Sequence, residues 1–368
     1  MSTPRTRAPA AGITARLPRG LVLDRRRGDH PGDAARIRES FDTGRYPHLP
    51  EPAVVVYRIA EGGHEQTGIV VEVSVDDYRA GRIRPHEATQ SERERLLTEF
   101  TELSGIEQMP VMLAHSPSGE LRSATEEVAS TEPDVDFTAA DGTRHTAWVR
   151  HDPELARAIE RGVGRFEALH ITDGHHRMAA AEHYAAQRHD LGPDHPAAFT
   201  AAALFPTDDM RVHGYHRCLP VSGGSAAGVL EKLMSLPTTA WWEKRPVATP
   251  EPGAVVVRFA DESYLMGLRS SAAPGHVRAS LDVVALDEEV LPALGIEPIS
   301  CGNGAPEHCR HAADEAVRFL VRPPGIEQIM AVSDAGLVLP PKSTWFSPKP
   351  APGLFLRDLT GATAQQDG

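Results

Sequence analysis

Two neighbouring segments of the chain have hydrophobic patterns of different period. β-branched and polar residues alternate over residues 52–78 around a Gly-Gly pair, which predicts a β-hairpin. From about Ser91, apolar residues recur at helical spacing, at Leu96, Leu97, Phe100 and Leu103. Gly105 follows them, and a glycine just past the last periodic residue is a typical helix stop. The pattern therefore predicts a hairpin followed by an amphipathic helix.

The next segments continue this alternation of strands and helices. A strand and turn are predicted from Met109, and a polar stretch runs from Arg122 to Asp141. The segment DPELARAIERGV then reads as a helix, because Asp152 can cap it and Pro153 suits its first position. The segment FEALHITDGHHR follows, and its apolar β-type residues give way at once to the Ala-rich MAAAEHYAAQR. A strand is thus expected to end, and a helix to begin, at residues 173–177.

The rest of the chain mixes the two periods irregularly. Strands are predicted in AAFTAAALFP and AVVVRFADESYLMGLR, and a helix in the segment that begins VSGGSAAGVLEKL. EHCRHAADEAVRFLVR reads as a helix, and IEQIMAVSDAGLVLPPKSTWF as a strand with a Pro-rich turn. The irregular order predicts a mixed α/β or α+β fold better than a doubly wound parallel sheet. Neither a GxxxxGK[ST] loop nor a GxGxxG fingerprint occurs in the sequence.

Composition and charge narrow the class of protein. The 368 residues are 40% hydrophobic and 24% charged, as in globular chains, and no apolar run is long enough to span a bilayer. With 51 acidic and 38 basic residues the net charge is −13, which argues against a broad nucleic-acid surface. Three cysteines, Cys218, Cys301 and Cys309, are too few for a disulfide framework, so a cytoplasmic location is expected.

The DGHHR segment is the main candidate for chemistry. A helix N-terminus offers unpaired N–H groups and a positive dipole end, both of which suit a phosphate. Gly174 permits close approach of the backbone, and Arg177 can hold phosphate oxygens in a fork. His175 and His176 add hydrogen-bond donors, and Asp173 has the oxygen ligands that Mg²⁺ prefers. These residues predict a nucleotide or phosphoryl site.

Two other interpretations of the segment must be weighed. The first is a metal site, since paired histidines are often metal ligands. Adjacent histidines at a strand-to-helix turn point in different directions, however, and no HExxH or CxxC accompanies them, so metal binding by this pair alone is disfavoured. The second is a purely structural turn, with Asp173 as the helix cap and Arg177 solvated. For DGHHR taken alone, the structural turn and the phosphate site carry similar weight.

Candidate residues outside this segment are weaker. Glu87 in RPHEAT is the best candidate base, beside His86, although a solvated loop acid has the same sequence pattern. The other substrate-binding candidates are polar residues of two later segments: His216 and Arg217 in GYHRCLP, and Lys342, Ser343 and Thr344 in PPKSTWF. The spacing of Cys301, His308, Cys309 and His311 suits no common zinc site.

Five ordered segments carry a resemblance to a known family. They are HEATQSERERLL, ITDGHHRMAAAEHY, YHRCLP, LDVVALDEEVLPALGI and PPKSTWFSPKPAPGLFLRDL. In this order they resemble the SerK-like family called domain of unknown function 1015, from about Pro52 to about Leu359. The family is related to free-serine kinases and, more distantly, to ParB and sulfiredoxin.

The resemblance implies a fold and a division of the chain. It implies an α+β (mixed α/β) fold in which a ParB/sulfiredoxin-like core carries additional N-terminal and C-terminal α+β elements. Residues 1–50 would be an N-terminal tail and variable segment, and residues 51–205 the nucleotide-binding core. Residues 206–368 would form a C-terminal α+β region that contributes to the substrate site.

The resemblance also implies roles for the candidate residues. Glu87 would take the proton from the substrate hydroxyl, with His86 orienting it. Asp173 and His176 would take part in catalysis, and residues 174–177 would bind the phosphates of ATP or ADP, with Mg²⁺ at Asp173. The expected activity is a nucleotide-dependent kinase acting on a hydroxy-amino acid, with free L-serine as the leading candidate. A homodimer is compatible with the sequence.

Rival functions from other classes predict different features. A ParB-like nucleotide-binding switch would need a basic DNA-binding helix or a dimer clamp, and the charge of −13 counts against the first. A sulfiredoxin-like redox enzyme would need a cysteine in the phosphate turn, and DGHHR has none. The kinase interpretation is therefore preferred.

Overall fold

The chain folds into two compact units. The computed structural model describes residues 12–23, 33–46, 48–49, 53–188, 190, 192–221, 226–246, 249–269, 275–295, 299–301 and 316–360. The described parts of residues 1–85, 89–210 and 348–368 form unit 1. Unit 2 comprises residues 86–88 and the described parts of 211–347. The chain therefore leaves unit 1 twice and returns to it twice.

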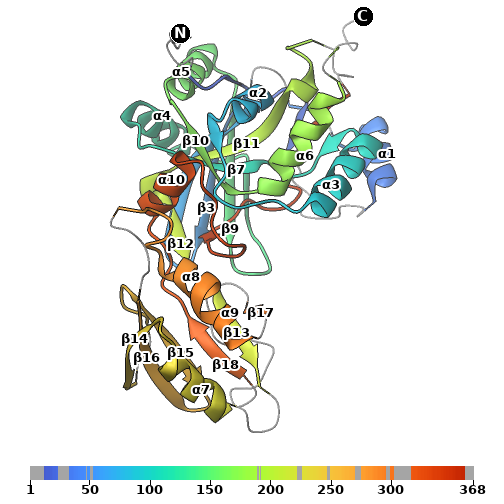
Figure 1. The fold of residues 1–368 in the computed structure, drawn as a ribbon. Helices are drawn as coiled ribbons and strands as arrows, with labels where there is room; N and C mark the ends of the chain where they lie inside the picture. Colours follow the sequence, from blue (N-terminus) through green and yellow to red (C-terminus); the bar gives the residue numbers. More distant parts are fainter. Residues whose placement is uncertain are drawn as a thin grey trace, which may run out of the picture. The chain divides into compact units, whose positions relative to one another are not determined.

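A nine-stranded mixed sheet is the centre of unit 1 (Figure 1). Along the sheet the order is β5-β10-β7-β11-β4-β3-β9-β8, with β1 on β4, and only β10·β5 and β11·β7 pair in parallel. The strands are, in chain order, β1 (Ala15–Arg16), β3 (Val54–Glu61), β4 (His64–Ser74), β5 (Ile83–Arg84), β7 (Val111–His115), β8 (Val135–Thr138), β9 (Arg144–Arg150), β10 (Leu169–Asp173) and β11 (Phe199–Pro206).

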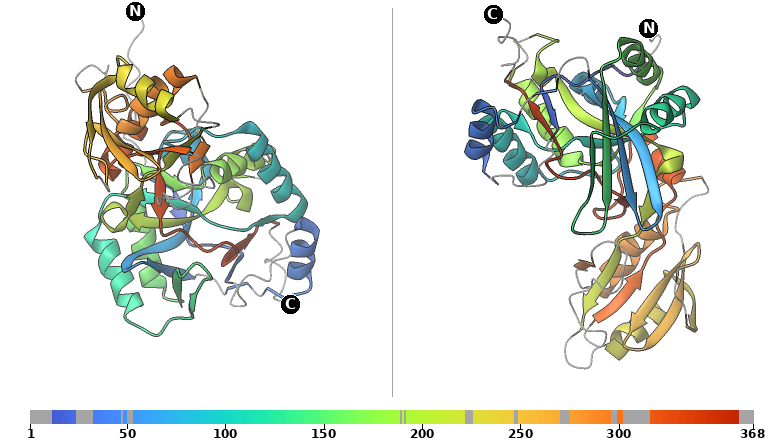
Figure 2. Two further views of the ribbon diagram at one scale, coloured as in Figure 1. Left: turned by 90° about the horizontal axis from the view of Figure 1, so that it is seen from below. Right: turned by 180° about the vertical axis from the view of Figure 1, so that it is seen from behind.

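Helices cover both faces of this sheet. In Figures 1 and 2, α4 (Gly119–Ala129) and α5 (Pro153–Gly164) lie on one side of the sheet, and α1 (Ala34–Asp42), α3 (Ser91–Ser104) and α6 (His175–Ala186) lie on the other. The short α2 (Val75–Arg79) packs against α6. On α5, the buried Ala156, Ile159 and Val163 recur at helical spacing and face the apolar core. Burying one such aliphatic side chain contributes roughly 1.5–3 kcal/mol, so Ile159→Ala would remove much of what fixes α5.

Segments from both ends of the chain complete unit 1. β20 (Phe355–Asp358) pairs with β2 (Leu21–Leu23) and with β6 (Ile106–Glu107) in a three-stranded sheet. Arg357 is buried there, with Nε 2.6 Å from Glu72 Oε1 and Nη1 3.0 Å from Glu107 Oε2. Breaking a buried ion pair leaves an uncompensated buried charge. The stability of unit 1 therefore depends on β20, the strand that carries Arg357.

Unit 2 is built on a six-stranded antiparallel sheet of order β14-β16-β15-β18-β13-β17 and on the pair β12·β19. Its strands are β12 (Arg211–His213), β13 (His216–Pro220), β14 (Thr239–Lys244), β15 (Ala254–Phe259), β16 (Glu262–Leu268), β17 (Ile299–Cys301), β18 (Ala316–Leu320) and β19 (Trp345–Ser347). Its helices are α7 (Ala226–Ser235), α8 (Asp282–Ala285), α9 (Leu291–Leu294) and α10 (Ile326–Asp334), and a π-helical turn, Leu286–Val290, joins α8 to α9.

The elements with clear sequence signals are confirmed. β3 and β4 form the predicted hairpin around Gly62 and Gly63, which adopt the positive φ values of 55° and 78° that favour glycine. α3 begins at Ser91 and ends at the left-handed Gly105. Asp152 caps α5 by accepting from the amides of Glu154 and Leu155. The α+β fold class, with added elements at both ends of the core, is confirmed as well.

Two sequence predictions are wrong, and one element is missed. The helix expected over EHCRHAADEAVRFLVR is replaced at its end by β18, which pairs with β13 and β15; residues 302–315 lie outside the described residues. IEQIMAVSD forms α10 rather than a strand. The polar stretch from Arg122, for which no element was predicted, contains most of α4, because the buried Leu121, Thr125 and Val128 give this helix only a sparse apolar stripe. In each case tertiary pairing or packing decides the structure.

Unit boundaries differ in detail from the division expected from the sequence. The main break falls after Met210 rather than after residue 205, and the described residues from 348 onward belong to unit 1 rather than to a C-terminal region. The described part of residues 1–50 also belongs to unit 1, where α1 packs on α3. Unit 2 is thus an insertion between β11 and the final strand of unit 1.

Candidate functional site

A β-bulge shapes the end of β10. Ile171 lies opposite Leu113 and Asp173 opposite Met112, so Thr172 is an extra residue in the ladder. Its hydroxyl donates to the carbonyl oxygen of Met112 at 3.1 Å. Such a bulge bends the strand and redirects the side chains that follow it. The pairing therefore ends where α6 begins, and we call residues 173–177 the α6 turn.

Gly174 is the N-cap of α6 and has φ 94° and ψ 28°. This left-handed conformation favours glycine, and glycine provides no side chain to cap the helix. A Cβ at this position would lie 2.6 Å from Arg177 Nη2 and 2.7 Å from Arg177 Nε. The guanidinium of Arg177 thus lies directly over the glycine. Asp173 is not the cap, and Arg177 is not solvated, so the purely structural turn considered above is not the arrangement found.

Asp173 is held between two cations. Arg177 Nη2 donates to Asp173 Oδ2 at 2.6 Å, and Lys349 Nζ donates to Asp173 Oδ1. Burial alone would raise the pKa of Asp173, but the charges of Lys349 and Arg177 outweigh burial and lower that pKa below its usual value. The carboxylate therefore stays ionised, and the three groups together carry one net positive charge.

Arg177 has hydrogen-bonding capacity that the fold leaves unused. Its Nε is buried and has no hydrogen-bond partner among the described residues. Burial lowers the pKa of Arg177, against the opposing effect of Asp173, although a guanidinium remains charged at neutral pH. A buried cationic donor without a partner is costly, so this atom is suited to an incoming anionic acceptor.

The two histidines of the turn have different surroundings. His175 is buried, whereas His176 is only partly buried. The backbone amide of Gln90 donates to His176 Nε2 at 3.0 Å, so that nitrogen is an acceptor and the ring is neutral in this arrangement. The contact links the α6 turn to the residue that caps α3. Gln90 and Lys349 were both missed by sequence reasoning.

An apolar pocket adjoins the α6 turn within unit 1. It has a volume of about 340 Å³, and Arg177 is one of its lining residues. Its walls come from α6, with Ala180, Ala181 and Tyr184, and from α3, with Leu97 and Phe100. Small and aromatic side chains beside a cationic turn make a pocket with one apolar and one positively charged end.

In unit 2, the structure brings together two of the segments singled out in the sequence. His86 is buried, its Nε2 lies 2.8 Å from Thr344 Oγ1, and its carbonyl oxygen accepts from the amide of Leu339 at 2.8 Å. Glu87, which is half-buried, forms a parallel bridge with Leu339. The candidate base is thus held beside the loop that contains Lys342, Ser343 and Thr344.

The PPKST loop is fixed by internal contacts. Ser343 Oγ donates to the carbonyl oxygen of Pro340 at 2.6 Å, and Lys342 has a positive φ of 61°. Lys342 Nζ lies 5.5 Å from the centre of the Tyr215 ring. Such a constrained backbone at a non-glycine residue persists only where neighbouring contacts hold it.

Arg217 supplies several of those contacts. Its Nε and Nη2 bind both oxygens of Asp287 at 2.9 and 2.5 Å, and its Nη1 donates to the carbonyl oxygens of Tyr215 and Lys342 at 3.1 and 3.0 Å. His216 Nδ1 accepts from the amide of Val321 at 3.3 Å. Both residues therefore have structural partners where the sequence had made them candidates for substrate binding.

The described residues do not form a metal site. No group of three or more His, Cys, Asp or Glu side chains among them is arranged to hold a metal ion. Both oxygens of Asp173 accept from cations, so this carboxylate does not fit the Mg²⁺ role expected of it. The side chains of Cys301, His308, Cys309 and His311 lie outside the described residues. Cys218 is disulfide-bonded, which the sequence did not predict.

Comparisons with known proteins identify the family to which the chain belongs. The fold and the α6 turn define an α+β protein with a positively charged turn at the start of a helix and an inserted second unit. The chain belongs to the family described as "Protein of unknown function (DUF1015)", whose model matches residues 33–284. No curated protein matches the chain significantly. Among the described residues, no helix has the length and apolar character that crossing a membrane requires.

Several solved structures are similar to the chain. C-terminally truncated SbnI from Staphylococcus aureus is 14% identical, with a TM-score of 0.45 over 81% of this chain and 90% of that one. A mutant free serine kinase in complex with ADP is 18% identical, with a TM-score of 0.39 over 78% and 92%. A conserved hypothetical protein from Pyrococcus furiosus is 17% identical, with a TM-score of 0.37 over 78% and 93%.

Proposed function

We propose that this protein is a nucleotide-dependent kinase that phosphorylates the hydroxyl of a small metabolite, with free L-serine as the leading candidate. ATP or ADP is the proposed phosphoryl donor, and O-phosphoserine is the proposed product. The observation that carries the proposal is the α6 turn, in which a positively charged cluster and a glycine cap lie beside an apolar pocket. The choice of serine rests on the motif resemblance alone.

The α6 turn has the chemistry of a phosphate cradle. The N-terminus of α6 provides the positive end of a helix dipole, and Gly174 keeps the backbone accessible. Arg177 and Lys349 carry two positive charges against the one negative charge of Asp173. In addition, Arg177 Nε lacks a hydrogen-bond partner among the described residues. We propose that Gly174, His175, His176 and Arg177 bind the nucleotide phosphates, with Asp173 and His176 also taking part in catalysis.

The apolar pocket suits the base of the nucleotide. Its volume of about 340 Å³ falls within the range of roughly 300–1,000 Å³ typical of small-molecule sites. Ala180 and Ala181 leave room along α6, and Tyr184 adds an aromatic ring, one face of which is covered by the Arg188 guanidinium at 3.6 Å. Because Arg177 lines the same pocket, a base bound there would direct its phosphates toward the α6 turn.

Glu87 is the proposed general base. It would accept the proton of the substrate hydroxyl while the oxygen attacks the terminal phosphorus of the nucleotide. A new bond forms between the substrate oxygen and phosphorus, and the bond from phosphorus to the bridging oxygen breaks, leaving ADP from ATP or AMP from ADP. Glu87 lies three residues before Gln90, whose backbone amide donates to His176 Nε2. His86, held by Thr344, is proposed to orient Glu87, and no step is assigned to a metal.

The decisive experiment incubates the purified full-length protein with ATP or ADP and a panel of hydroxy-amino acids, and follows phosphoamino-acid formation. Glu87→Gln should lower turnover by about 10²–10⁴-fold, the usual contribution of a general base, and should leave nucleotide affinity nearly unchanged. Glu92→Gln is the matched control, since this exposed glutamate on α3 pairs only locally with Arg95.

Two outcomes would contradict the proposal. Nucleotide binding without product from any hydroxyl substrate would favour the ParB-like nucleotide-binding switch. Wild-type turnover in Glu87→Gln would show that Glu87 is not the base, whatever the substrate.

A further inference from the structure

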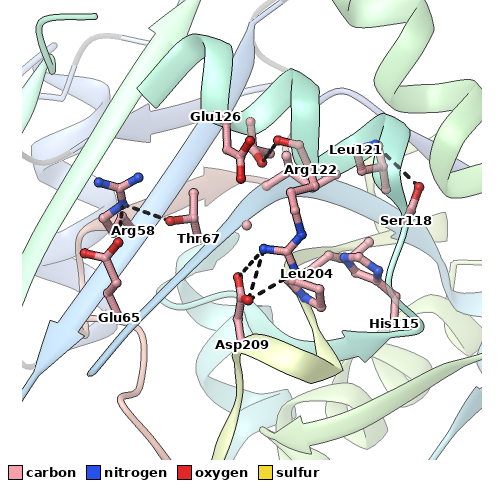
Figure 3. A pocket seen from close by; sticks show the side chains of 14 residues that line it. Arg58, Glu65, Thr67, His115, Ser118, Leu121, Arg122, Glu126, Leu204 and Asp209 are labelled. Atoms are coloured by element: carbon pink, nitrogen blue, oxygen red, sulfur yellow. Dashed lines mark hydrogen bonds and ion pairs between the residues drawn. The ribbon is translucent and has the colours of Figure 1, made fainter. Parts of the chain in front are cut away.

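A second, polar pocket lies in unit 1 between α4 and the strands β3 and β4, and we call it the α4 pocket (Figure 3). It has a volume of about 210 Å³. The residues that bear on its chemistry are polar or charged: Arg58, Thr67, His115, Arg122, Glu126 and Asp209. A polar pocket of this size is smaller than a typical nucleotide or drug site, and suits a small metabolite.

The α4 pocket is separate from the α6 turn. β10 and β7 are antiparallel neighbours, with Asp173 opposite Met112 and His170 opposite Ala114. His115, the last residue of β7, lines the α4 pocket, so pocket and turn lie toward opposite ends of this strand pair. At about 3.3 Å per residue, three residues of strand separate Met112 from His115 by roughly 10 Å. A ligand in this pocket is therefore not positioned to accept a phosphoryl group at the α6 turn.

His115 presents an unused acceptor to the pocket. The residue is only 4% exposed, and its ring stacks on Phe166 with the ring centres 4.7 Å apart. Its Nδ1 lies 2.8 Å from the carbonyl oxygen of Ser116, which can only accept, so Nδ1 carries the proton. Nε2 is then a lone-pair acceptor without a hydrogen-bond partner among the described residues. Burial also lowers the pKa of His115, which keeps the ring neutral.

Arg122 is not available to a ligand. Its Nη1 lies 3.1 Å from Asp209 Oδ1 and its Nη2 2.8 Å from Asp208 Oδ2, so two carboxylates more than balance its charge. These contacts fix the guanidinium on the side of the pocket where His115 lies (Figure 3).

Arg58 and Glu126 are the available cation and anion. Arg58 Nε donates to Thr67 Oγ1 at 2.8 Å, and the exposed Glu65 lies 4.0 Å away. Within the described part of the chain, the two Nη atoms of Arg58 have no hydrogen-bond partner, and the carboxylate of Glu126 has neither a hydrogen bond nor an ion pair, although its charge acts on Arg122. Figure 3 shows Arg58 across the pocket from His115, with Glu126 projecting from α4 near the space between them.

We infer that the α4 pocket binds a small zwitterion, an α-amino acid, as a second and non-catalytic site. The carboxylate of the ligand would take the free Nη donors of Arg58 in a bidentate fork. Its ammonium group would donate to His115 Nε2 and would be neutralised by Glu126. The lining residues comprise two arginines and three carboxylates, so the pocket attracts a ligand with a positive group and disfavours a simple anion.

The test is titration calorimetry on the full-length protein without nucleotide, using L-amino acids that lack a side-chain hydroxyl. At least one should bind with a Kd below about 10 mM. Its decarboxylated amine and its N-acetyl derivative should bind at least ten-fold more weakly, because each lacks one of the two charges. Arg58→Gln and Glu126→Gln should each weaken binding by about ten-fold, as expected for loss of a charge-assisted contact.

Three control variants accompany this test. Glu127→Gln changes the neighbouring residue of α4, which does not line the pocket, and Arg144→Gln changes an exposed arginine of β9; neither should alter amino-acid binding. Arg177→Ala should also leave it unchanged, which separates this inference from the proposed kinase site. The inference is overturned if no amino acid binds. It is equally overturned if binding survives in both Arg58→Gln and Glu126→Gln, or depends on Arg177.

Discussion

Arg177 in unit 1 and Arg217 in unit 2 both pair with an aspartate, but the fold uses them differently. Arg217 is 3% exposed, binds both oxygens of Asp287 and donates to three carbonyl oxygens as well. Arg177 makes one hydrogen bond, to Asp173, and its Nε has no partner in the described structure. The carboxylate of Asp173 is moreover shared with Lys349.

The difference separates a structural arginine from one suited to binding. When every donor is occupied by the protein, the arginine stabilises the backbone around it, here the PPKST loop. When donors are left over beside a glycine cap and a pocket, an anion can complete the set. Both arginines stand in conspicuous motifs, DGHHR and YHRCLP, so motif context alone does not distinguish these roles.

The largest expected effect is on stability, from Arg217→Ala. Truncation leaves Asp287 without its charged partner in a mostly buried position, which typically costs about 3–5 kcal/mol. Chemical denaturation followed by tryptophan fluorescence checks this, since three of the four tryptophans, Trp241, Trp242 and Trp345, lie in unit 2. A loss below about 1 kcal/mol would show that Arg217 is not the structural residue described.

Arg177→Ala should affect binding more than stability. Loss of a charge-assisted hydrogen bond to phosphate corresponds to roughly 1.5–3 kcal/mol, or about a 10- to 100-fold weaker affinity for ADP or ATP. Calorimetric titration measures it. Arg79→Ala is the control, since Arg79 pairs with Glu182 on the exposed surface of α6 and should leave affinity unchanged. If Arg177→Ala binds ADP or ATP as tightly as the wild type, Arg177 does not bind the nucleotide, and its role does not differ from that of Arg217.

Gly174→Ala tests whether the glycine positions Arg177. A Cβ there meets the guanidinium at 2.6 Å, so the arginine must move, and we expect an affinity loss of about 3- to 10-fold. The positive φ adds a stability cost of about 1 kcal/mol. Gly142→Ala is the matched control: its φ is 88°, and no described atom lies within 4 Å of the added Cβ. If both variants bind nucleotide alike, the position of Arg177 does not depend on Gly174.

The smallest expected effect is in acid, through Asp173. Because the pKa of Asp173 is lowered in the folded state, its stabilisation is fully present above the unfolded value of about 4 and is lost as pH falls through the folded value. Lys349→Met removes one of the two cations, so protonation should begin at higher pH and cost up to about 1 kcal/mol near pH 4. A carboxyl-carbon NMR titration measures the change. Lys349→Arg should restore the wild-type profile, and unchanged titration in Lys349→Met would contradict the described pairing.

Local signals predicted much of the fold. The Gly62-Gly63 hairpin, the stop at Gly105 and the Asp152 cap all act within a few residues, so the sequence pattern reports them directly. β18 was expected to be helical because AVRFL alone is ambiguous, and only pairing with β13 and β15 selects the strand. Propensity is a weak prior where such long-range pairing decides.

The candidate site shows the same limit. The strand-to-helix change at Asp173 was predicted from composition and is confirmed as β10 followed by α6. The partner Lys349 lies 176 residues further along the chain, and the Gln90 contact to His176 involves a backbone amide. No spacing in a single sequence reports either contact, since both depend on how distant segments meet. Whether Glu87 and the α6 turn act together stays a prediction.

The return of residues 348–360 to unit 1 has a consequence for biosynthesis. A nascent chain leaves the ribosome N-terminus first, so most of the large sheet emerges before β20 does. Glu72 and Glu107 lack their partner Arg357 until β20 has been translated. Unit 2, except for residues 86–88, is contiguous in the chain and is complete earlier. We therefore expect unit 1 to mature only after β20 has been synthesised, and truncation before Arg357 to yield an aggregation-prone intermediate.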